Sequence, residues 1–328
     1  MDIKIKISLP KAVLMTLKND CKNFNILKAD GSQNFNAFIN NLVINYYEDF
    51  SANEEILHDN IKTALDIVPD RYKEKLFTDM IKIIAKKQVS VLDGESTSFS
   101  FKPTKMSERA ITFIENILIK SESISSYYRR MFITYVSKTQ PQRERIIFKE
   151  NYDILQKAIK KRVRVCIVTK GDSIKNTSVY GVFSAKEELY NYVLSTDGQT
   201  LFTIRLANIK SVSVLSDKSE IPEYIKDVFN RQIRCGVQYP IFKEEDKLIK
   251  VKFTEKGIYL FNRIYLYRPT PVKTDGNIYY FDCSTNQAIH YFKRLGGDAV
   301  IIEPRSVVEI MRNFYTGAMK KYNKLLER

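Results

Sequence analysis

The chain has 328 residues, of which 44% are hydrophobic, and its formal net charge is +15 at pH 7. This composition excludes a wholly disordered chain, and the length predicts about two or three domains. No apolar run approaches the length of a membrane span and the first residues lack a signal-peptide core, so we expect no membrane partner and a cytoplasmic location.

The positive charge favours an acidic polymer as the partner. The chain carries 53 Lys and Arg against 38 Asp and Glu, and its 20 Tyr and 19 Phe supply rings on which unpaired bases can stack. The alternative is a basic protein whose Lys content reflects only the composition of its genome.

The N-terminal region predicts a strand and two helices that occur twice. Apolar residues alternate with polar ones from Ile3 to Leu9, Pro10 opens a helix, and a second amphipathic helix follows Gly31-Ser32. A single strand would leave its edge unpaired, and residues 98–136 repeat the pattern. We therefore expect one domain over residues 1–140, with a helical spacer at 51–96 formed by helices at Asn53–Val68 and Arg71–Lys87.

This tandem unit resembles two ribbon-helix-helix halves fused in one chain. The resemblance implies that the strands pair antiparallel, that the second helices begin near Asn34 and Ser125, and that the outward side chains can enter a DNA groove. Those side chains are Lys4, Lys6, Ser8, Ser98, Ser100 and Lys102. None of them is an Arg, Asn or Gln that could read a base with two hydrogen bonds, so the unit is either a DNA-binding ribbon or only a folding module.

A hairpin is predicted within Glu188–Val214. Asp197-Gly198 is a strong turn dipeptide between two alternating runs, and the first run is predicted to be a strand with Tyr190 and Tyr192 on one face. Arg205 stands between two apolar residues in the second run, where it either faces solvent or lines a pocket that needs fixed N–H donors.

The same hairpin resembles the signature of the WYL domain. Tyr192 stands for the Trp of that family, Leu194 for its Leu, Arg205 for its first Arg and Ile209 for its Ile. The chain departs from the family pattern at Val193, Ala207 and Asn208. The resemblance implies an Sm-like β-barrel at about 155–216, within a domain at 141–240.

Two further features precede this hairpin in the sequence. A polar, basic joint is predicted at Thr139–Phe148, and a helix at Tyr152–Lys160 leads into a strand at Val163–Thr169. We expect single-stranded RNA to bind over the barrel, with bases on the Tyr rings and phosphates on the cations. The residues proposed for this are Tyr190, Tyr192, Arg205, Lys210, Lys161, Arg162 and Arg164.

Residues 241–328 predict a strand–helix–strand–strand–helix–strand order, which is ferredoxin-like, with strands that include Ile264–Arg268 and Ala299–Glu303 and a closing helix after Pro304. The segment resembles the C-terminal extension that often follows WYL domains, and this resemblance implies a homodimer. The predicted fold class is therefore α+β, with the tandem ribbon-helix-helix-like, barrel and ferredoxin-like parts in that order.

Catalysis is not predicted. The chain has two histidines, His58 and His290, and four isolated cysteines, with no phosphate-binding Gly-rich loop and no known catalytic or zinc-binding spacing. We expect no catalytic residue, no metal and no cofactor.

The order of the three parts is similar to that of the WYL accessory proteins of type VI-D CRISPR loci. This resemblance implies an RNA-binding protein that assists an RNA-guided RNA nuclease. The alternative is a DNA-binding transcriptional regulator whose WYL domain senses a ligand, and a third class is a protein–protein adaptor.

Overall fold

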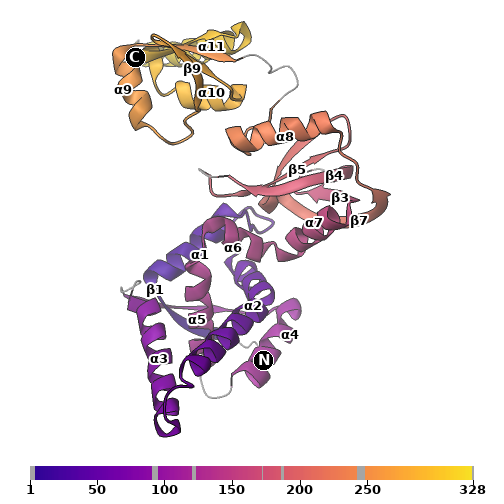
Figure 1. Ribbon diagram of the computed structural model, residues 1–328, viewed down its shortest axis with the longest axis vertical. Helices are drawn as coiled ribbons and strands as arrows, with labels where there is room; N and C mark the ends of the chain where they lie inside the picture. The colour runs from indigo at the N-terminus through magenta and orange to yellow at the C-terminus, as the bar shows by residue number, and fades with distance from the viewer. Residues whose placement is uncertain are drawn as a thin grey trace. The chain divides into compact units, whose positions relative to one another are not determined.

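The computed structural model describes residues 4–90, 95–119, 123–171, 173–185, 188–241 and 248–326. The chain divides into two compact units. The first comprises Met1–Asp153 with Leu206–Lys210, and the second comprises Ile154–Arg205 with Ser211–Arg328. Helices and antiparallel sheets occur in both units, which confirms the predicted α+β class (Figure 1).

The first unit is built on a two-stranded antiparallel ribbon. Strand β1 (Ile5–Pro10) pairs with β2 (Ser96–Phe101), and Lys6 lies opposite Ser100. Because side chains alternate along a strand, the apolar residues of β1 are buried while Lys6 is exposed. The tandem arrangement predicted from the sequence therefore pairs its two strands within one chain.

Two helices follow each strand of the ribbon. After β1 come α1 (Lys11–Asn23) and α2 (Phe35–Ala64). After β2 come α4 (Lys105–Phe113), which ends in a π-helical turn at Ile114–Leu118, and α5 (Ile124–Val136).

Helix α2 corrects the predicted spacer. The separate helix expected at Asn53–Val68 is instead the continuation of α2, a single helix of 30 residues. No Gly or Pro interrupts the chain between Phe35 and Ala64, so nothing in the sequence ends the helix earlier. The second spacer helix is α3 (Asp70–Ser90), close to its expected range.

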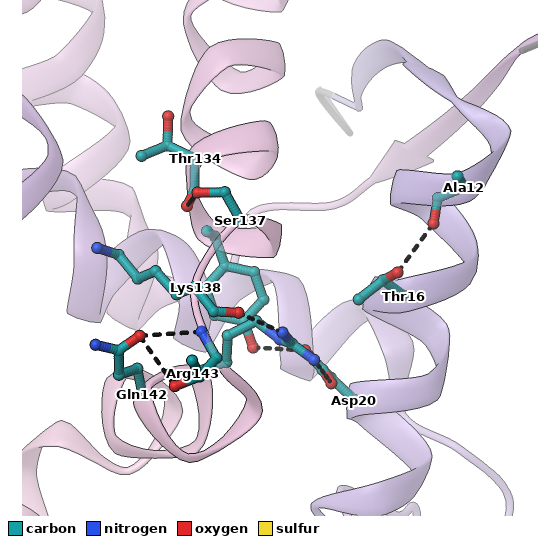
Figure 2. Close-up of polar contacts among 10 residues, drawn as sticks. Ala12, Thr16, Asp20, Thr134, Ser137, Lys138, Gln142 and Arg143 are labelled. Carbon is teal, nitrogen blue, oxygen red and sulfur yellow. Dashed lines mark hydrogen bonds and ion pairs between the residues drawn. The ribbon is translucent and has the colours of Figure 1, made fainter. Parts of the chain in front are cut away.

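A buried ion pair joins α1 to α6 (Gln140–Ile147) (Figure 2). The Arg143 Nε lies 2.7 Å from the Asp20 carboxylate, whose side chain is 2% exposed. The Tyr135 hydroxyl donates to the same carboxylate over 3.0 Å, and burial next to Asp20 raises the Tyr135 pKa well above its usual value. Arg143 also donates to the Lys138 carbonyl over 2.6 Å.

Helix α6 corrects the predicted joint at Thr139–Phe148. Pro141 is compatible with the first turn of a helix, and the Thr139 N–H donates to the Gln142 side chain over 2.9 Å. The polar composition that suggested a loop is therefore that of a capped helix.

The second unit contains a five-stranded antiparallel sheet that follows α7 (Lys149–Lys161). Its strands are β3 (Val163–Thr169), β4 (Ser173–Ser184), β5 (Asn191–Thr196), β6 (Leu201–Arg205) and β7 (Ile209–Lys218), in the order β6-β5-β4-β3-β7. Within the part of the chain that the structure describes, no pairing of β6 with β7 closes this sheet into a barrel.

One face of the sheet is covered by α8 (Glu223–Cys235), which the sequence analysis missed. Ile225 and Phe229 of this helix pack with Leu194 of β5 in one apolar cluster. The face that carries Leu194 therefore belongs to the interior of the second unit.

The C-terminal module, residues 248–326, has the predicted ferredoxin-like order. Its elements are β8 (Ile249–Phe253), α9 (Glu255–Arg263), β9 (Pro271–Asp275), β10 (Ile278–Phe281), α10 (Thr285–Phe292), β11 (Ala299–Glu303) and α11 (Arg305–Leu326), and the strand order is β11-β8-β10-β9. The strand expected at Ile264–Arg268 is wrong: Tyr267 has a φ of 64°, outside the extended region, and the strand begins at Pro271.

Candidate nucleic-acid interface

The β5–β6 hairpin places Arg205 at the end of a strand. Tyr192 lies directly opposite Arg205, and the turn is closed at the far end, where Gly198 has a φ of 102°. The Asp197 carboxylate accepts the N–H groups of Gln199 and Thr200, and these bonds lower the Asp197 pKa. The predicted Asp-Gly hairpin is therefore present, and its register fixes the position of Arg205.

The guanidinium of Arg205 lies over the ring of Tyr190, with 3.3 Å between its central carbon and the ring centroid. Tyr190 does not lie on β5, as the sequence suggested, but in the loop that precedes it. Leu189 has a φ of 59°, so the chain leaves the extended conformation there, and the Tyr190 carbonyl accepts the Ala185 N–H over 2.8 Å. This loop carries the ring beneath the cation, where the two groups attract each other.

Tyr192 has a different environment. Its half-buried ring packs against the cluster formed with Phe229 of α8, and its hydroxyl donates to the Glu188 carboxylate. Because these contacts already hold the ring, Tyr192 is suited to supporting the loop that carries Tyr190 rather than to stacking a base.

A second cation, Lys170, lies near Arg205. Desolvation and then the positive charge of Arg205 lower the Lys170 pKa. Two cations that repel each other in this way favour an anion between or beside them. Lys170 was not predicted as a site residue, because it follows β3, far from the hairpin in sequence, and no local pattern marks it.

The other cations proposed for the barrel lie on other elements. Arg164 donates to the Asn176 carbonyl and lowers the pKa of Asp197, at the turn end of the hairpin. Four residues of β6 separate that end from Arg205, about 13 Å along a strand. Lys161 and Arg162 are exposed at the junction of α7 and β3, and Lys210 is exposed in the segment that belongs to the first unit.

The ribbon presents a second basic surface, in the first unit. The outward residues Lys4, Lys6, Ser98, Ser100 and Lys102 are exposed, and Ser8 is half-buried. The residue that follows β2 is held by α2, because the Asn36 side chain both accepts the Lys102 N–H over 2.8 Å and donates to its carbonyl over 3.0 Å. Near the start of α2, polar groups are therefore used to fix the ribbon.

The described residues contain no group of three or more His, Cys, Asp or Glu side chains that could hold a metal ion. Nor does any helix in the described ranges combine the length and apolar character needed to cross a bilayer.

The fold resembles that of a solved structure described as "Crystal structure of a CRISPR Cas-related protein". The TM-score is 0.63, with 16% sequence identity over 99% of this chain and 95% of the other. A proteasome accessory factor B/C of Arthrobacter aurescens aligns over 69% of this chain and 40% of its own length, with 12% identity and a TM-score of 0.27, which is too weak to contribute to the argument. No protein-family profile and no curated protein matches the chain. The chain therefore shares the whole fold of the first protein.

Proposed function

We propose that this chain is a non-enzymatic accessory protein that binds single-stranded RNA and enhances an RNA-guided CRISPR RNA nuclease, as the type VI-D resemblance implies. The observation that carries the proposal is the position of Arg205, over the Tyr190 ring and near Lys170. RNA-binding proteins hold unpaired bases on aromatic or guanidinium planes and neutralise the adjacent phosphates with cations.

Three other facts support the proposal. The residues that resemble the WYL signature, Tyr192, Leu194 and Arg205, lie together on one hairpin. The net charge of +15 supplies salt-dependent affinity for a polyanion. The fold likeness covers nearly the full length of a CRISPR Cas-related protein.

In this proposal a phosphate lies against Arg205 and Lys170, and a neighbouring base stacks on the Arg205–Tyr190 pair. Arg205 presents several N–H donors in a fixed plane, which suits two hydrogen bonds to one phosphate. Tyr192 and Glu188 hold the loop that carries Tyr190, so their effect on binding is indirect. Lys161, Arg162, Arg164 and Lys210 contribute general electrostatic attraction.

The second candidate is a DNA-binding regulator whose WYL-like domain senses a ligand, and the ribbon favours it. Lys4, Lys6 and Lys102 are exposed on the outward face of β1, β2 and their flanks, where a groove-binding ribbon requires them. The serines between them supply little base discrimination, so this surface suits backbone contacts rather than sequence reading.

Competition at one fixed salt concentration separates these candidates. A labelled single-stranded RNA bound to the full chain is displaced with unlabelled single-stranded RNA or with duplex DNA of the same length. The proposal expects the RNA to compete more strongly, and stronger competition by the duplex favours the regulator. Binding that is absent at low and high salt alike leaves only the protein–protein adaptor.

The nuclease partner requires its own test. The RNA cleavage rate of a purified CRISPR RNA nuclease is measured with and without the chain, and with the Arg205→Ala variant. Enhancement that the variant loses supports the accessory role. Unchanged cleavage in every case removes the nuclease part of the proposal and leaves RNA binding to stand by itself.

A further inference from the structure

A pocket of about 520 Å³ lies within the second unit. Its walls include Phe183 of β4, Ile233 of α8 and Val272 of β9, together with the polar residues Arg234, Arg268 and Gln287. The volume falls within the range of about 300–1,000 Å³ that is usual for small-molecule sites. None of its polar residues belongs to the proposed RNA site.

The pocket is positively charged. Arg234 is exposed and Arg268 is half-buried, and both line it. The carboxylate in the lining, Asp282, is neutralised by Arg231 at 2.7 Å. Two arginines therefore line the pocket beside a carboxylate that already has its own ion pair, and they favour an anionic ligand; Arg268 also donates from Nη1 to the Phe261 and Asn262 carbonyls.

Gln287 supplies a second, independent sign of a ligand. The residue is 4% exposed, and its backbone N–H donates to Ser284, which caps α10. Its side-chain Oε1 has no hydrogen-bond partner among the residues that the structure describes. A buried amide oxygen without a donor is costly, and a donor on a bound molecule would remove that cost.

We propose that this pocket binds a small phosphate-bearing molecule of nucleotide size. Arg234 and Arg268 hold the phosphate, and the Gln287 amide, which can both donate and accept, meets the polar edge of a base. The apolar side chains, Phe183 and Val272 among them, cover the rest of the ligand. This site is distinct from the RNA site at Arg205 and does not depend on it.

Adenosine monophosphate is the probe, and calorimetry with the full chain measures its binding against inorganic phosphate. We expect the nucleotide to bind at about 1 mM or below and phosphate to bind more weakly, because phosphate alone leaves Gln287 without a donor. Arg234→Glu should weaken nucleotide binding about tenfold or more. Gln287→Leu, which keeps the volume, should weaken nucleotide binding without changing phosphate binding.

Two variants serve as controls. Arg305→Glu changes another exposed arginine, on α11, and should leave nucleotide binding unchanged, and so should Arg205→Ala. The proposal is overturned if neither probe binds, if phosphate binds as tightly as the nucleotide, or if Arg234→Glu binds like the original chain. A loss of nucleotide binding in Arg205→Ala also overturns it, because the nucleotide would then occupy the RNA site.

Discussion

The central guanidinium carbon of Arg205 lies over the ring of Tyr190, 3.3 Å from the ring centroid, at the end of the β5–β6 hairpin. Replacing Arg205 by Ala should reduce single-stranded RNA affinity by about 1–3 kcal/mol, because it removes charged hydrogen bonds to the RNA. Fluorescence anisotropy with a labelled RNA measures the change. Arg205→Lys keeps the charge but not the planar group, so it should recover only part of the affinity.

The matched control is the double variant Lys4→Ala and Lys6→Ala, which removes two exposed cations from the ribbon. It should change RNA affinity little and duplex DNA affinity more. If the double variant costs more RNA affinity than Arg205→Ala, the site of RNA binding is the ribbon.

Lys170 should contribute through phosphate neutralisation. RNA affinity falls as the salt concentration rises, and a plot of the two logarithms gives a slope. In Lys170→Ala this slope should become shallower by about 0.7, the amount expected for one phosphate contact on a single strand. Titrations at several salt concentrations measure the slope. An unchanged slope would place Lys170 outside the interface, and Lys256→Ala, in the C-terminal module, is the comparison for a general charge effect.

The ion pair between Asp20 and Arg143 should hold the first unit together. Asp20→Asn removes the charge that compensates a guanidinium whose side chain is 12% exposed, and it should lower the free energy of unfolding by about 3–5 kcal/mol. Urea denaturation measures the loss. Arg305→Ala breaks a pair with Glu309 whose arginine side chain is 93% exposed, so it should cost about 1 kcal/mol or less.

Two helical glycines should respond in opposite directions to alanine. A Cβ on Gly257 of α9 would lie 1.9 Å from the Asp298 carbonyl oxygen, so Gly257→Ala must displace backbone and should destabilise the C-terminal module. No atom lies within 4 Å of a Cβ on Gly317 of α11, and Gly317→Ala should stabilise the helix by about 1 kcal/mol. Thermal denaturation of the full chain compares them. A stabilised Gly257→Ala variant would contradict the packing of α9, and a destabilised Gly317→Ala variant would contradict the open surroundings of Gly317 on α11.

His290 should make stability depend on pH. Desolvation, followed by the charges of Lys293 and Arg294, lowers its pKa below 6.5, against a smaller opposing effect of Glu188. The unfolded chain therefore takes up the proton first as pH falls, so the contribution of His290 is fully present above pH 6.5 and is lost toward the lowered pKa. Urea denaturation from pH 7.5 to about 5 should show a smaller loss for His290→Gln. An identical pH profile in this variant would rule His290 out as a cause.

Strands and helices with a clear pattern in their own residues were predicted from the sequence. The apolar-rich segments Val163–Thr169 and Ala299–Glu303 were predicted as strands, and both strands have these bounds in the structure. The end of β6 was not predicted, because a 3-10 turn at Leu206–Asn208 interrupts a run that looks continuous in sequence. Helix α8 had a readable signal in Pro222, Ile225 and Phe229, which the sequence analysis did not use.

The candidate site was less predictable than the fold. Arg205 was identified from its place between apolar neighbours, but the sequence placed both Tyr rings on one strand. The turn at Leu189 places the Tyr190 ring against the Arg205 guanidinium, whereas the half-buried Tyr192 ring packs against the apolar cluster that includes Phe229 of α8. Lys170 comes close to Arg205 only in the tertiary structure. The walls of the separate pocket at Gln287 are likewise brought together only by the tertiary structure.

The pairing of β1 with β2 inside one polypeptide has a consequence for how this ribbon can change. Where two identical subunits supply the strands, every substitution appears twice and symmetry ties the halves together. Here Lys6 faces Ser100 rather than a copy of itself, so each half can evolve independently. Because the partner strand is always tethered, assembly of the ribbon is also insensitive to dilution.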